Sequence, residues 1–503
     1  SLSLLNVVSL ANEKSGNFNA AVKNYKQALE IVPNSPELYY NIGNNFKEQG
    51  KLQEAIEAYN KALSIKPDYE TARAVKLYIQ AEICDWDSIA EDIALIPELG
   101  TSDEFVPPFS MLSLEDAPER HRLRSETYAK AKYPQKPLPS SAKPSKKPKR
   151  IRIGYFSTDF KEHPLALLIA KVFELHNRVE FEVFGYSLQG SSLGNLRQRL
   201  ENSFDYFTDV QSMSDKEITL LARQDKIDIV IDLNGYTQNS RTGIFAYRAA
   251  PIQINYLGYP GTMGADFMDY IIADENLIPT TSQKYYSEKT IYLPHHYQAQ
   301  DDSLPIANDT PSRSALGLPE KGFVFCAHGG SFKITSSQFS LWMRLLQNLD
   351  GSILWLLDNN KWAKANLLKE ANARGVASER LVFAQKVSQE KYLAQFRQAD
   401  LYLDTFICNA GATASNALWA GLPILTKLGK GYTARMAGSL LQSLGLPELI
   451  TTTEEEYENL ALELARNPQN LSIIKRKLAD NKLSKLLFDT KLFTKHLEDG
   501  YQQ

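Results

Sequence analysis

The amino-acid sequence predicts an α + α/β protein, in which a helical repeat region precedes two doubly wound parallel-sheet domains. Three observations predict this fold. A motif recurs at a fixed spacing near the N-terminus, apolar strands alternate with helices from Ile151 onward, and the alternation restarts after a loop-like stretch at 305–319. A chain of 503 residues is long enough for about three domains.

The first helical segments carry an internal repeat. The recurring pairs, each 34 positions apart, are Gly16/Gly50, Ala21/Ala55, Tyr25/Tyr59, Ala28/Ala62, Leu29/Leu63 and Pro33/Pro67. This period, with small residues where helices cross and a proline after the second helix, resembles the tetratricopeptide repeat. Cys84 stands where a third copy would have glycine, so we expect the array to end in a divergent capping region. The first residues begin inside a repeat, which favours further repeats upstream.

The concave face of such an array usually binds peptide, and a purely structural collar is the alternative. After the repeats, shifts in composition divide the chain. The segment 134–150 has five prolines, three serines and a lysine cluster, which cannot bury apolar surface. The expected parts are tetratricopeptide repeats at 1–76, a helical transition at 77–133, a Pro/Lys-rich linker or loop at 134–150, an N-terminal Rossmann-like lobe at 151–310 and a C-terminal Rossmann-like lobe at 311–503.

Each lobe is predicted from a series of short apolar strands. The predicted strands are 152–156, 181–186, 227–233, 252–256 and 270–273 in the first lobe, and 323–326, 353–357, 381–383, 401–403 and 424–425 in the second. Doubly wound sheets bind ligands at the carboxyl ends of their strands. Two such lobes in tandem therefore predict a ligand site between them.

Charge and composition exclude several classes of function. The 56 basic and 59 acidic residues leave a net charge of -3, which gives no sign of a nucleic-acid or acidic-membrane partner. Three scattered cysteines favour a reducing compartment, and the adjacent His295 and His296 lack further ligands for a metal site. No apolar run approaches ~20 residues and no signal-peptide pattern is present, so we expect a cytoplasmic protein without membrane attachment.

Two features of the second lobe suit a phosphate. A turn of small residues at 409–415 separates a strand from a helix expected to begin near Asn416, and unpaired N–H groups at a helix start attract anions. Lys333, just past strand 323–326, lies at the same sheet edge, where a cation can neutralise a departing phosphate. A plain strand-to-helix turn and an ordinary surface lysine are the alternatives.

Polar turns also end the strands of the first lobe. Asp159 and His163 follow its first strand, and either can take a proton from a hydroxyl, although a histidine before proline often only caps a helix. Asn234 and Thr237 follow the third strand, and the turn 257–262 ends the next one. Both of these glycine-containing turns lie where a sugar or an acceptor would be held.

Together these motifs resemble the O-GlcNAc transferase family of protein glycosyltransferases. The segments that carry the resemblance, over about residues 5–490, are the repeats and RIGYFSTDFKEHP, DLNGYTQNSR, APIQINYLGYPGT, YSEKTIYLP, SFKI and CNAGATASNALWAGLPILT. The resemblance implies a glycosyltransferase of the two-Rossmann-domain GT-B type, inverting, independent of metal and without a cofactor. Its implied partners are a nucleotide sugar, most simply UDP-N-acetylglucosamine, and proteins held along the repeats that accept the sugar on serine or threonine.

The resemblance also implies roles for individual residues. Lys333 matches the lysine that stabilises the diphosphate leaving group, and His163 and Asp159 match the histidine and aspartate argued to be the general base. The implied sugar and acceptor pocket consists of Leu257, Gly258, Tyr259, Pro260, Asn234 and Thr237. The implied donor-binding residues are Thr413, Ala412, Gly411, Asn416, Val387, Gln389, Gly330 and Arg241.

Several donor positions differ from the pattern of the animal enzymes. Gly411 and Ala412 stand where those enzymes have histidine and threonine, Asn416 where they have the ribose-binding aspartate, and Gln389 where they have a base-contacting lysine. Two alternatives therefore stay open. One is a transferase of the same fold that uses another nucleotide sugar, such as GDP-fucose, and the other is a repeat-bearing binding protein with weakened catalysis.

Overall fold

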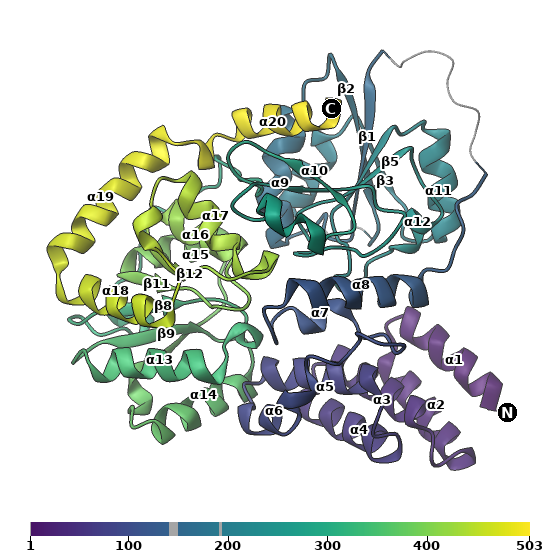
Figure 1. Ribbon diagram of the computed structural model, residues 1–503, viewed down its shortest axis with the longest axis horizontal. Coiled ribbons are helices and arrows are strands. Elements are labelled where there is room, and N and C mark those ends of the chain that lie inside the picture. The colour runs from purple at the N-terminus through teal and green to yellow at the C-terminus, as the bar shows by residue number, and fades with distance from the viewer. Residues whose placement is uncertain (1, 140–148, 191–193) are drawn as a thin grey trace.

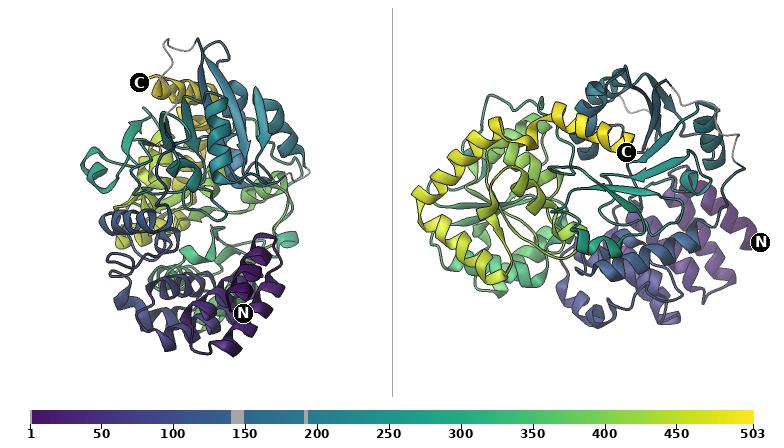
Figure 2. Two further views of the ribbon diagram at one scale, coloured as in Figure 1. Left: turned by 90° about the vertical axis from the view of Figure 1, so that its right-hand side faces the viewer. Right: turned by 45° about the horizontal axis from the view of Figure 1, so that its top comes forward.

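A computed structural model describes residues 2–139, 149–190 and 194–503. A helical region lies along one side of two α/β lobes, each built on its own parallel sheet (Figure 1). Figure 2 shows the first repeat helices at one end of the molecule and the C-terminal helix at the other. Among the described residues, no helix is both long and apolar enough to cross a membrane.

The repeats form as the 34-residue period predicts. Their helices are α1 (Leu2–Lys14), α2 (Phe18–Ile31), α3 (Pro36–Glu48), α4 (Leu52–Ile65), α5 (Glu70–Glu82) and α6 (Trp86–Asp92). Gly16 and Gly50 turn the chain between paired helices with φ of 72° and 70°, in the left-handed region. Cys84 takes the same conformation, with φ of 55°, although a side chain disfavours it. A third helix pair is therefore present, with a shortened second helix.

A short helical region joins the repeats to the first lobe. It contains α7 (Pro108–Met111) and α8 (Pro118–Lys132). Arg124 of α8 is fully buried and donates hydrogen bonds to the carbonyls of Ile96 and Leu99, which fixes α8 against the preceding loop. Residues 140–148 of the expected linker lie outside the described residues, so that part of the prediction stays a prediction.

The first lobe is a parallel sheet covered by helices on both faces. Its strands are β1 (Ile151–Ser157), β2 (Phe181–Ser187), β3 (Tyr206–Asp209), β4 (Ile229–Asp232), β5 (Ile252–Asn255), β6 (Tyr270–Ala273) and β7 (Lys289–Tyr292), in the order β3-β2-β1-β4-β5-β6-β7. Its helices are α9 (Pro164–Leu175), α10 (Asn195–Ser203), α11 (Asp215–Gln224) and α12 (Gly243–Ala246). Successive β1 side chains face opposite ways, so Tyr155 packs under α9 while Phe156 packs under α12.

The second lobe repeats this plan. Its strands are β8 (Val324–Ala327), β9 (Ile353–Leu357), β10 (Leu381–Ala384), β11 (Leu401–Leu403), β12 (Ile424–Lys427) and β13 (Ile450–Thr451), in the order β10-β9-β8-β11-β12-β13. Its helices are α13 (Ser336–Gln347), α14 (Lys361–Ala373), α15 (Gln389–Gln395), α16 (Ala412–Ala420), α17 (Met436–Ser443), α18 (Glu454–Arg466) and α19 (Pro468–Ser484). Both sheets have the doubly wound topology that the sequence predicts.

The last helix, α20 (Thr490–Gln502), leaves the second lobe and packs on the first (Figure 1). Glu498 accepts a hydrogen bond from Asn177 N at 2.7 Å and lies 2.9 Å from His176 Nδ1, and Tyr501 Oη lies 3.0 Å from Tyr155 Oη. The region 311–503, which we expected to form one lobe, therefore contributes its final helix to the other. The reason is chemical, because the buried face of α20 complements polar groups of β1 and α9.

Candidate functional site

The first candidate group lies where the strand order reverses in the first sheet. β1 and β4 are neighbours there, and the chain leaves them in opposite directions. Asn234, after β4, reaches the turn after β1, where its Nδ2 donates to Asp159 Oδ2 at 2.8 Å and to Thr158 Oγ1 at 2.9 Å. Its Oδ1 accepts from Thr158 N at 2.8 Å. Asn234 is 1% exposed, and these hydrogen bonds fix the orientation of the Asp159 carboxylate.

His163 begins α9 and caps it. Its Nδ1 accepts the Leu165 N–H at 3.3 Å and lies 3.8 Å from Asp159 Oδ2, beyond hydrogen-bonding distance. Partial burial lowers the pKa of His163, although the nearby Asp159 carboxylate opposes this shift. Because Nδ1 accepts the Leu165 N–H, the proton of the neutral His163 ring is on Nε2. His163 thus caps α9 and also lies near Asp159.

The rest of the turn after β4 divides into two parts. Thr237 Oγ1 lies 3.4 Å from Asn234 Nδ2, so it belongs to the Asp159 group. Arg241 pairs with Asp215 at the start of α11 and donates to the Met213 carbonyl at 2.8 Å. Its guanidinium is thus engaged within the first lobe, and in the described part of the chain its hydrogen bonds and ion pair reach none of the other expected donor-binding residues.

The turn after β5 is unusually constrained. Leu257 has φ of 73°, a left-handed conformation that is rare for a branched side chain. A Cβ added to Gly258 would lie 1.9 Å from the Leu233 carbonyl oxygen, so only glycine fits there. Leu257 and Pro260 are half-buried at the surface of this turn, whereas Tyr259 is 1% exposed and packs in the core. Backbone strain of this kind concentrates at functional sites.

The second candidate group lies where the strand order reverses in the second sheet, between β8 and β11. Lys333 ends a single 3₁₀ turn, Ser331–Lys333, that Gly330 begins after β8. Its Nζ donates to the Asn409 carbonyl at 2.8 Å, in the loop after β11. The charge of this ammonium group acts on two buried neighbours, the Asp404 carboxyl and the Cys408 thiol, and opposes the rise in pKa that burial causes in both.

Asp404, which sequence reasoning missed, organises the loop after β11. It is fully buried, and its carboxylate accepts from Thr405 N, Ala410 N and Thr426 Oγ1 at 2.6–2.8 Å. Burial raises its pKa to about 7, while these bonds and the Lys333 charge oppose the shift. The only sequence signal was an acidic residue directly after a buried strand. Asp404 folds the loop so that α16 begins beside Lys333.

Helix α16 begins in the turn that the sequence predicts to bind a phosphate. It begins at Ala412, four residues before Asn416, because alanine and threonine at 412–414 continue the helix back to Gly411. Gly411 provides no side-chain cap, and within the described chain the N–H groups of Ala412 and Thr413 have no hydrogen-bond partner. Unpaired donors at a helix start suit a phosphate.

Two of the altered donor positions contact each other. Gln389 Nε2 at the start of α15 donates to Asn416 Oδ1 on α16 at 3.0 Å. Val387, two residues before Gln389, is 40% exposed at the carboxyl edge of the sheet. The expected donor-binding residues of α15, α16 and the Lys333 turn thus surround one edge of the second sheet, with Arg241 apart from them.

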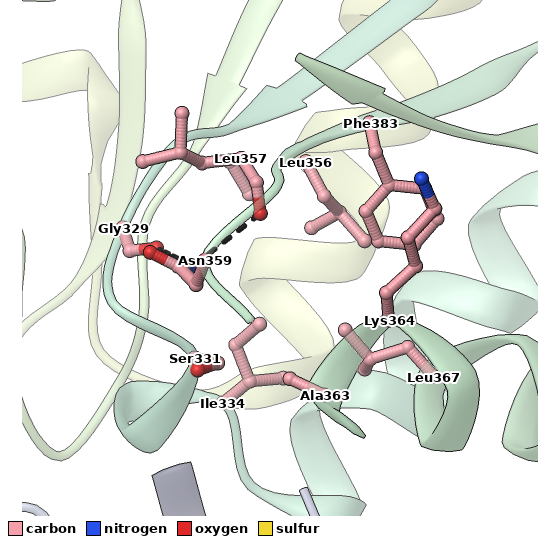
Figure 3. Close-up of a pocket in the computed structure, with 11 residues that line it drawn as sticks. Gly329, Ser331, Ile334, Leu356, Leu357, Asn359, Ala363, Lys364, Leu367 and Phe383 are labelled. Carbon is pink, nitrogen blue, oxygen red and sulfur yellow. Dashed lines mark hydrogen bonds between the residues drawn. The ribbon is translucent and has the colours of Figure 1, made fainter. Parts of the chain in front are cut away.

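A small cavity of about 10 Å³ lies behind the Lys333 turn, too small for a substrate. Figure 3 shows Asn359 at its edge, where its Nδ2 donates to the Gly329 carbonyl at 3.0 Å. The remaining lining is largely apolar side chains of β9 and α14, such as Leu356 and Leu367. The cavity side of the turn is therefore packed against β9 and α14, while the Lys333 ammonium group bonds the loop after β11.

The two candidate groups are linked through their helices. α9, which begins at the Asp159–His163 group, contacts α16, which begins at the Lys333 group, across the lobe boundary. In addition, Gln300 of the segment that joins the lobes donates to Ser415 Oγ at 2.9 Å. The predicted arrangement of two sheet edges that share one site is consistent with this contact.

Comparison with known protein families covers most of the chain. The model of glycosyl transferase family 41 matches residues 129–308 and 298–497, and tetratricopeptide repeat models match 14–50 and 36–69. A solved structure, an O-GlcNAc transferase mutant of Thermobaculum terrenum, is 26% identical and superimposes with a TM-score of 0.80 over 99% of this chain and 96% of that one. The predicted fold is thereby confirmed.

Curated relatives carry related names. A probable UDP-N-acetylglucosamine–peptide N-acetylglucosaminyltransferase SEC of Arabidopsis thaliana is 38% identical over 359 residues, which is 70% of this chain and 37% of the relative. The corresponding transferase of Caenorhabditis elegans is 28% identical, with 70% and 40% covered, and a probable one named SPINDLY of Petunia hybrida is 28% identical, with 71% and 39% covered. The chain spans about two fifths of the length of these relatives. On the family match, with both lobes and the repeats in place, the chain belongs to glycosyl transferase family 41 and is similar to its O-GlcNAc transferases.

Proposed function

We propose that the protein is an inverting, metal-independent glycosyltransferase that moves a sugar to serine or threonine hydroxyls of proteins. The first candidate donor is UDP-N-acetylglucosamine. Membership of family 41 supports glycosyl transfer, and the names of the Arabidopsis and Caenorhabditis relatives support this donor and a peptide acceptor.

The observation that carries the proposal is the complementary chemistry at the starts of two helices that touch. At α9, Asp159 and His163 offer proton acceptors beside a neutral polar turn. At α16, unpaired N–H groups and the Lys333 ammonium offer positive charge. Glycosyl transfer releases a proton from the acceptor hydroxyl and a diphosphate from the donor. It therefore needs a proton acceptor and a positively charged group.

In the proposed step, the acceptor oxygen bonds to the anomeric carbon while the bond from that carbon to the diphosphate oxygen breaks. The electron pair stays on the diphosphate, where Lys333 and the N–H groups of α16 stabilise the added charge. The hydroxyl proton passes to a base in the Asp159–His163 group, directly or through a water molecule. Attack opposite the leaving group inverts the anomeric configuration.

Metal independence belongs to the proposal because Lys333 and the helix start supply the positive charge that a divalent ion would otherwise bring to a diphosphate. We expect EDTA to leave the initial rate of transfer unchanged. A rate that falls with EDTA and returns with added Mg²⁺ or Mn²⁺ would contradict this part of the proposal.

A second candidate, a donor other than a UDP sugar, is worth testing because Gln389 stands where the resemblance places a base-contacting lysine, and its side chain bonds Asn416. Asn416 Oδ1 already accepts from Gln389, so a ribose hydroxyl that donates to this oxygen must share it. A neutral amide also attracts such a hydroxyl less strongly than a carboxylate does. GDP-fucose is the second donor to test.

Thermal unfolding with nucleotides distinguishes a UDP-sugar donor, a GDP-fucose donor and a binding protein with weakened catalysis. We would measure the melting temperature with UDP, GDP, UDP-N-acetylglucosamine and GDP-fucose, because a ligand at 100 times its Kd adds about 2.7 kcal/mol to the unfolding free energy. Transfer of labelled sugar to a library of peptides rich in serine and threonine would follow for each nucleotide that binds.

Each outcome has a distinct meaning. Stabilisation by UDP together with transfer supports the first donor, and stabilisation by GDP together with transfer supports the second. Stabilisation without transfer supports a repeat-bearing binding protein with weakened catalysis. If no nucleotide raises the melting temperature, the proposed enzyme activity is wrong.

A further inference from the structure

The end of the repeat array docks directly on the turn that carries Lys333. Ser331 Oγ donates to the Glu82 carbonyl at 2.6 Å, and Cys84 Sγ lies 3.7 Å from the Ser331 carbonyl oxygen. Trp86 Nε1 donates to the Ile334 carbonyl at 3.1 Å. The two residues that flank Phe332 and Lys333 in the turn are thus both bonded to the repeat array.

Aromatic packing and buried side chains reinforce this contact. Phe332, next to Lys333, packs on Tyr78 of α5 with ring centroids 5.3 Å apart. Cys84 is 1% exposed, Trp86 8% and Ser331 2%, so water does not compete for these bonds. Cys84 and Trp86 belong to the hydrophobic core of the second lobe although they follow α5 in sequence.

The backbone conformation of Cys84 gives a separate indication that its contact with Ser331 has a role. The equivalent positions of the two preceding repeats, Gly16 and Gly50, have left-handed backbones and no side chain. Cys84 adopts the same conformation with a side chain present, and that side chain meets Ser331. Stability of the turn alone would favour glycine, so a side chain here points to a role in the contact.

The second lobe holds the same turn at other points. Asn359 bonds the Gly329 carbonyl before the turn, and Lys333 Nζ bonds the Asn409 carbonyl. Asn360 and Asn366 of the second lobe donate to the carbonyls of Glu82 and Ile83, which anchors the end of α5 itself. The segment 331–334 therefore lies between the anchored end of the repeats and the carboxyl edge of the second sheet.

We propose that the end of the repeat array is a positioning element for Lys333, with Cys84 and Trp86 as the positioning residues. They hold the 331–334 turn so that the ammonium group stays at the carboxyl edge of the second sheet, beside the start of α16. The proposal rests on the proposed function, in which Lys333 stabilises the leaving diphosphate. Loosening the turn should thus lower kcat and leave the binding of both substrates almost unchanged.

Two mild substitutions test the proposal in the full chain. Trp86→Phe removes the indole N–H and keeps an aromatic ring against Phe339, whose centroid lies 5.1 Å away. Cys84→Gly removes the thiol and suits the left-handed backbone. Ser203→Ala is the control, because it also removes a buried hydrogen bond to a carbonyl, from Ser203 Oγ to Leu200 at 2.8 Å, in a helix of the first lobe away from the turn.

We expect Trp86→Phe and Cys84→Gly to lower kcat at least fivefold, with KM for donor and acceptor within twofold of the parent. Melting temperatures should stay within the range of the control. Amide hydrogen exchange at 330–334, measured without substrate, should be faster in both variants and unchanged in Ser203→Ala. A parental kcat in both variants, or a loss that appears only in KM, would overturn the proposal.

The exchange measurement keeps this proposal separate from the proposed function. If the parent transfers no sugar from any nucleotide donor, the proposed function fails. Unchanged exchange at 330–334 in both variants would overturn the contact as a positioning element whether or not the parent is active.

Discussion

Gln389 Nε2 donates a hydrogen bond to Asn416 Oδ1 at 3.0 Å, which ties the start of α15 to α16 through two neutral amides. The resemblance places a lysine and an aspartate at these positions in the animal enzymes. The two departures therefore form one neutral pair, and they should act together on donor binding.

We expect Asn416→Asp to tighten nucleotide binding. A carboxylate can accept from Gln389 and from a ribose hydroxyl at once, and a hydrogen bond to a charged group is worth about 1.5–3 kcal/mol. The Kd of the preferred nucleotide should fall roughly tenfold, which corresponds to about 1.4 kcal/mol. Isothermal titration calorimetry checks this, and an unchanged Kd would show that position 416 does not meet the ribose.

Replacing Lys333 should separate catalysis from binding. Lys333→Met removes the ammonium group that we place on the leaving diphosphate, so kcat should fall by at least about 10²-fold. The nucleotide should still stabilise the variant, because the N–H groups of α16 remain. Lys361→Met is the matched control, since Lys361 is exposed on α14. Turnover that equals the parent in Lys333→Met would contradict the assignment.

His163 should give the pH dependence of transfer a characteristic acid limb. Partial burial lowers its pKa below the ordinary value of 6.5, so the ring is neutral and able to accept a proton at pH 7. Acidification protonates it, and kcat/KM should fall only below pH 6.5. His163→Asn keeps an acceptor for the helix cap and removes the titration. The acid limb should vanish in this variant while the melting temperature stays close to that of the parent; persistence of the limb would move the base to Asp159 or another group.

Gly258 should be intolerant of any side chain. A Cβ there would lie 1.9 Å from the Leu233 carbonyl oxygen, and backbone atoms cannot move aside as a side chain can. Gly258→Ala should cost about 3 kcal/mol of unfolding free energy. Gly351→Ala is the control, because its site is open and only its left-handed φ of 67° opposes alanine, at about 1 kcal/mol. Urea unfolding measures both, and equal losses would contradict the steric argument.

The strands that the sequence did not predict share one property. β3, β7 and β13 lie at the edges of their sheets, and each is short or partly exposed. Tyr206 of β3, for example, is 53% exposed. Central strands such as β4 are buried on both faces and therefore appear in the sequence as continuous apolar runs. These three edge strands lack this signal, whereas β10, also at an edge, was predicted from its apolar run at 381–383.

Within the site, the turns were predictable and their connections were not. The positions of Asp159 and Lys333 follow from the rule that ligands bind at the carboxyl ends of parallel strands. The Asn234–Asp159 hydrogen bond joins residues 75 positions apart, and no local pattern encodes it. Asp404 was missed for a similar reason, because its partners become neighbours only when the loop after β11 has folded.

The return of α20 to the first lobe gives the chain two crossings between its lobes, and the crossings lie side by side. Thr490 Oγ1 donates to the Gln300 carbonyl at 3.0 Å and accepts from Asp302 N at 3.2 Å, and His296 Nε2 lies 3.3 Å from the Leu486 carbonyl oxygen. These bonds fasten the two crossing segments to each other, so the chain passes between its lobes twice at one place.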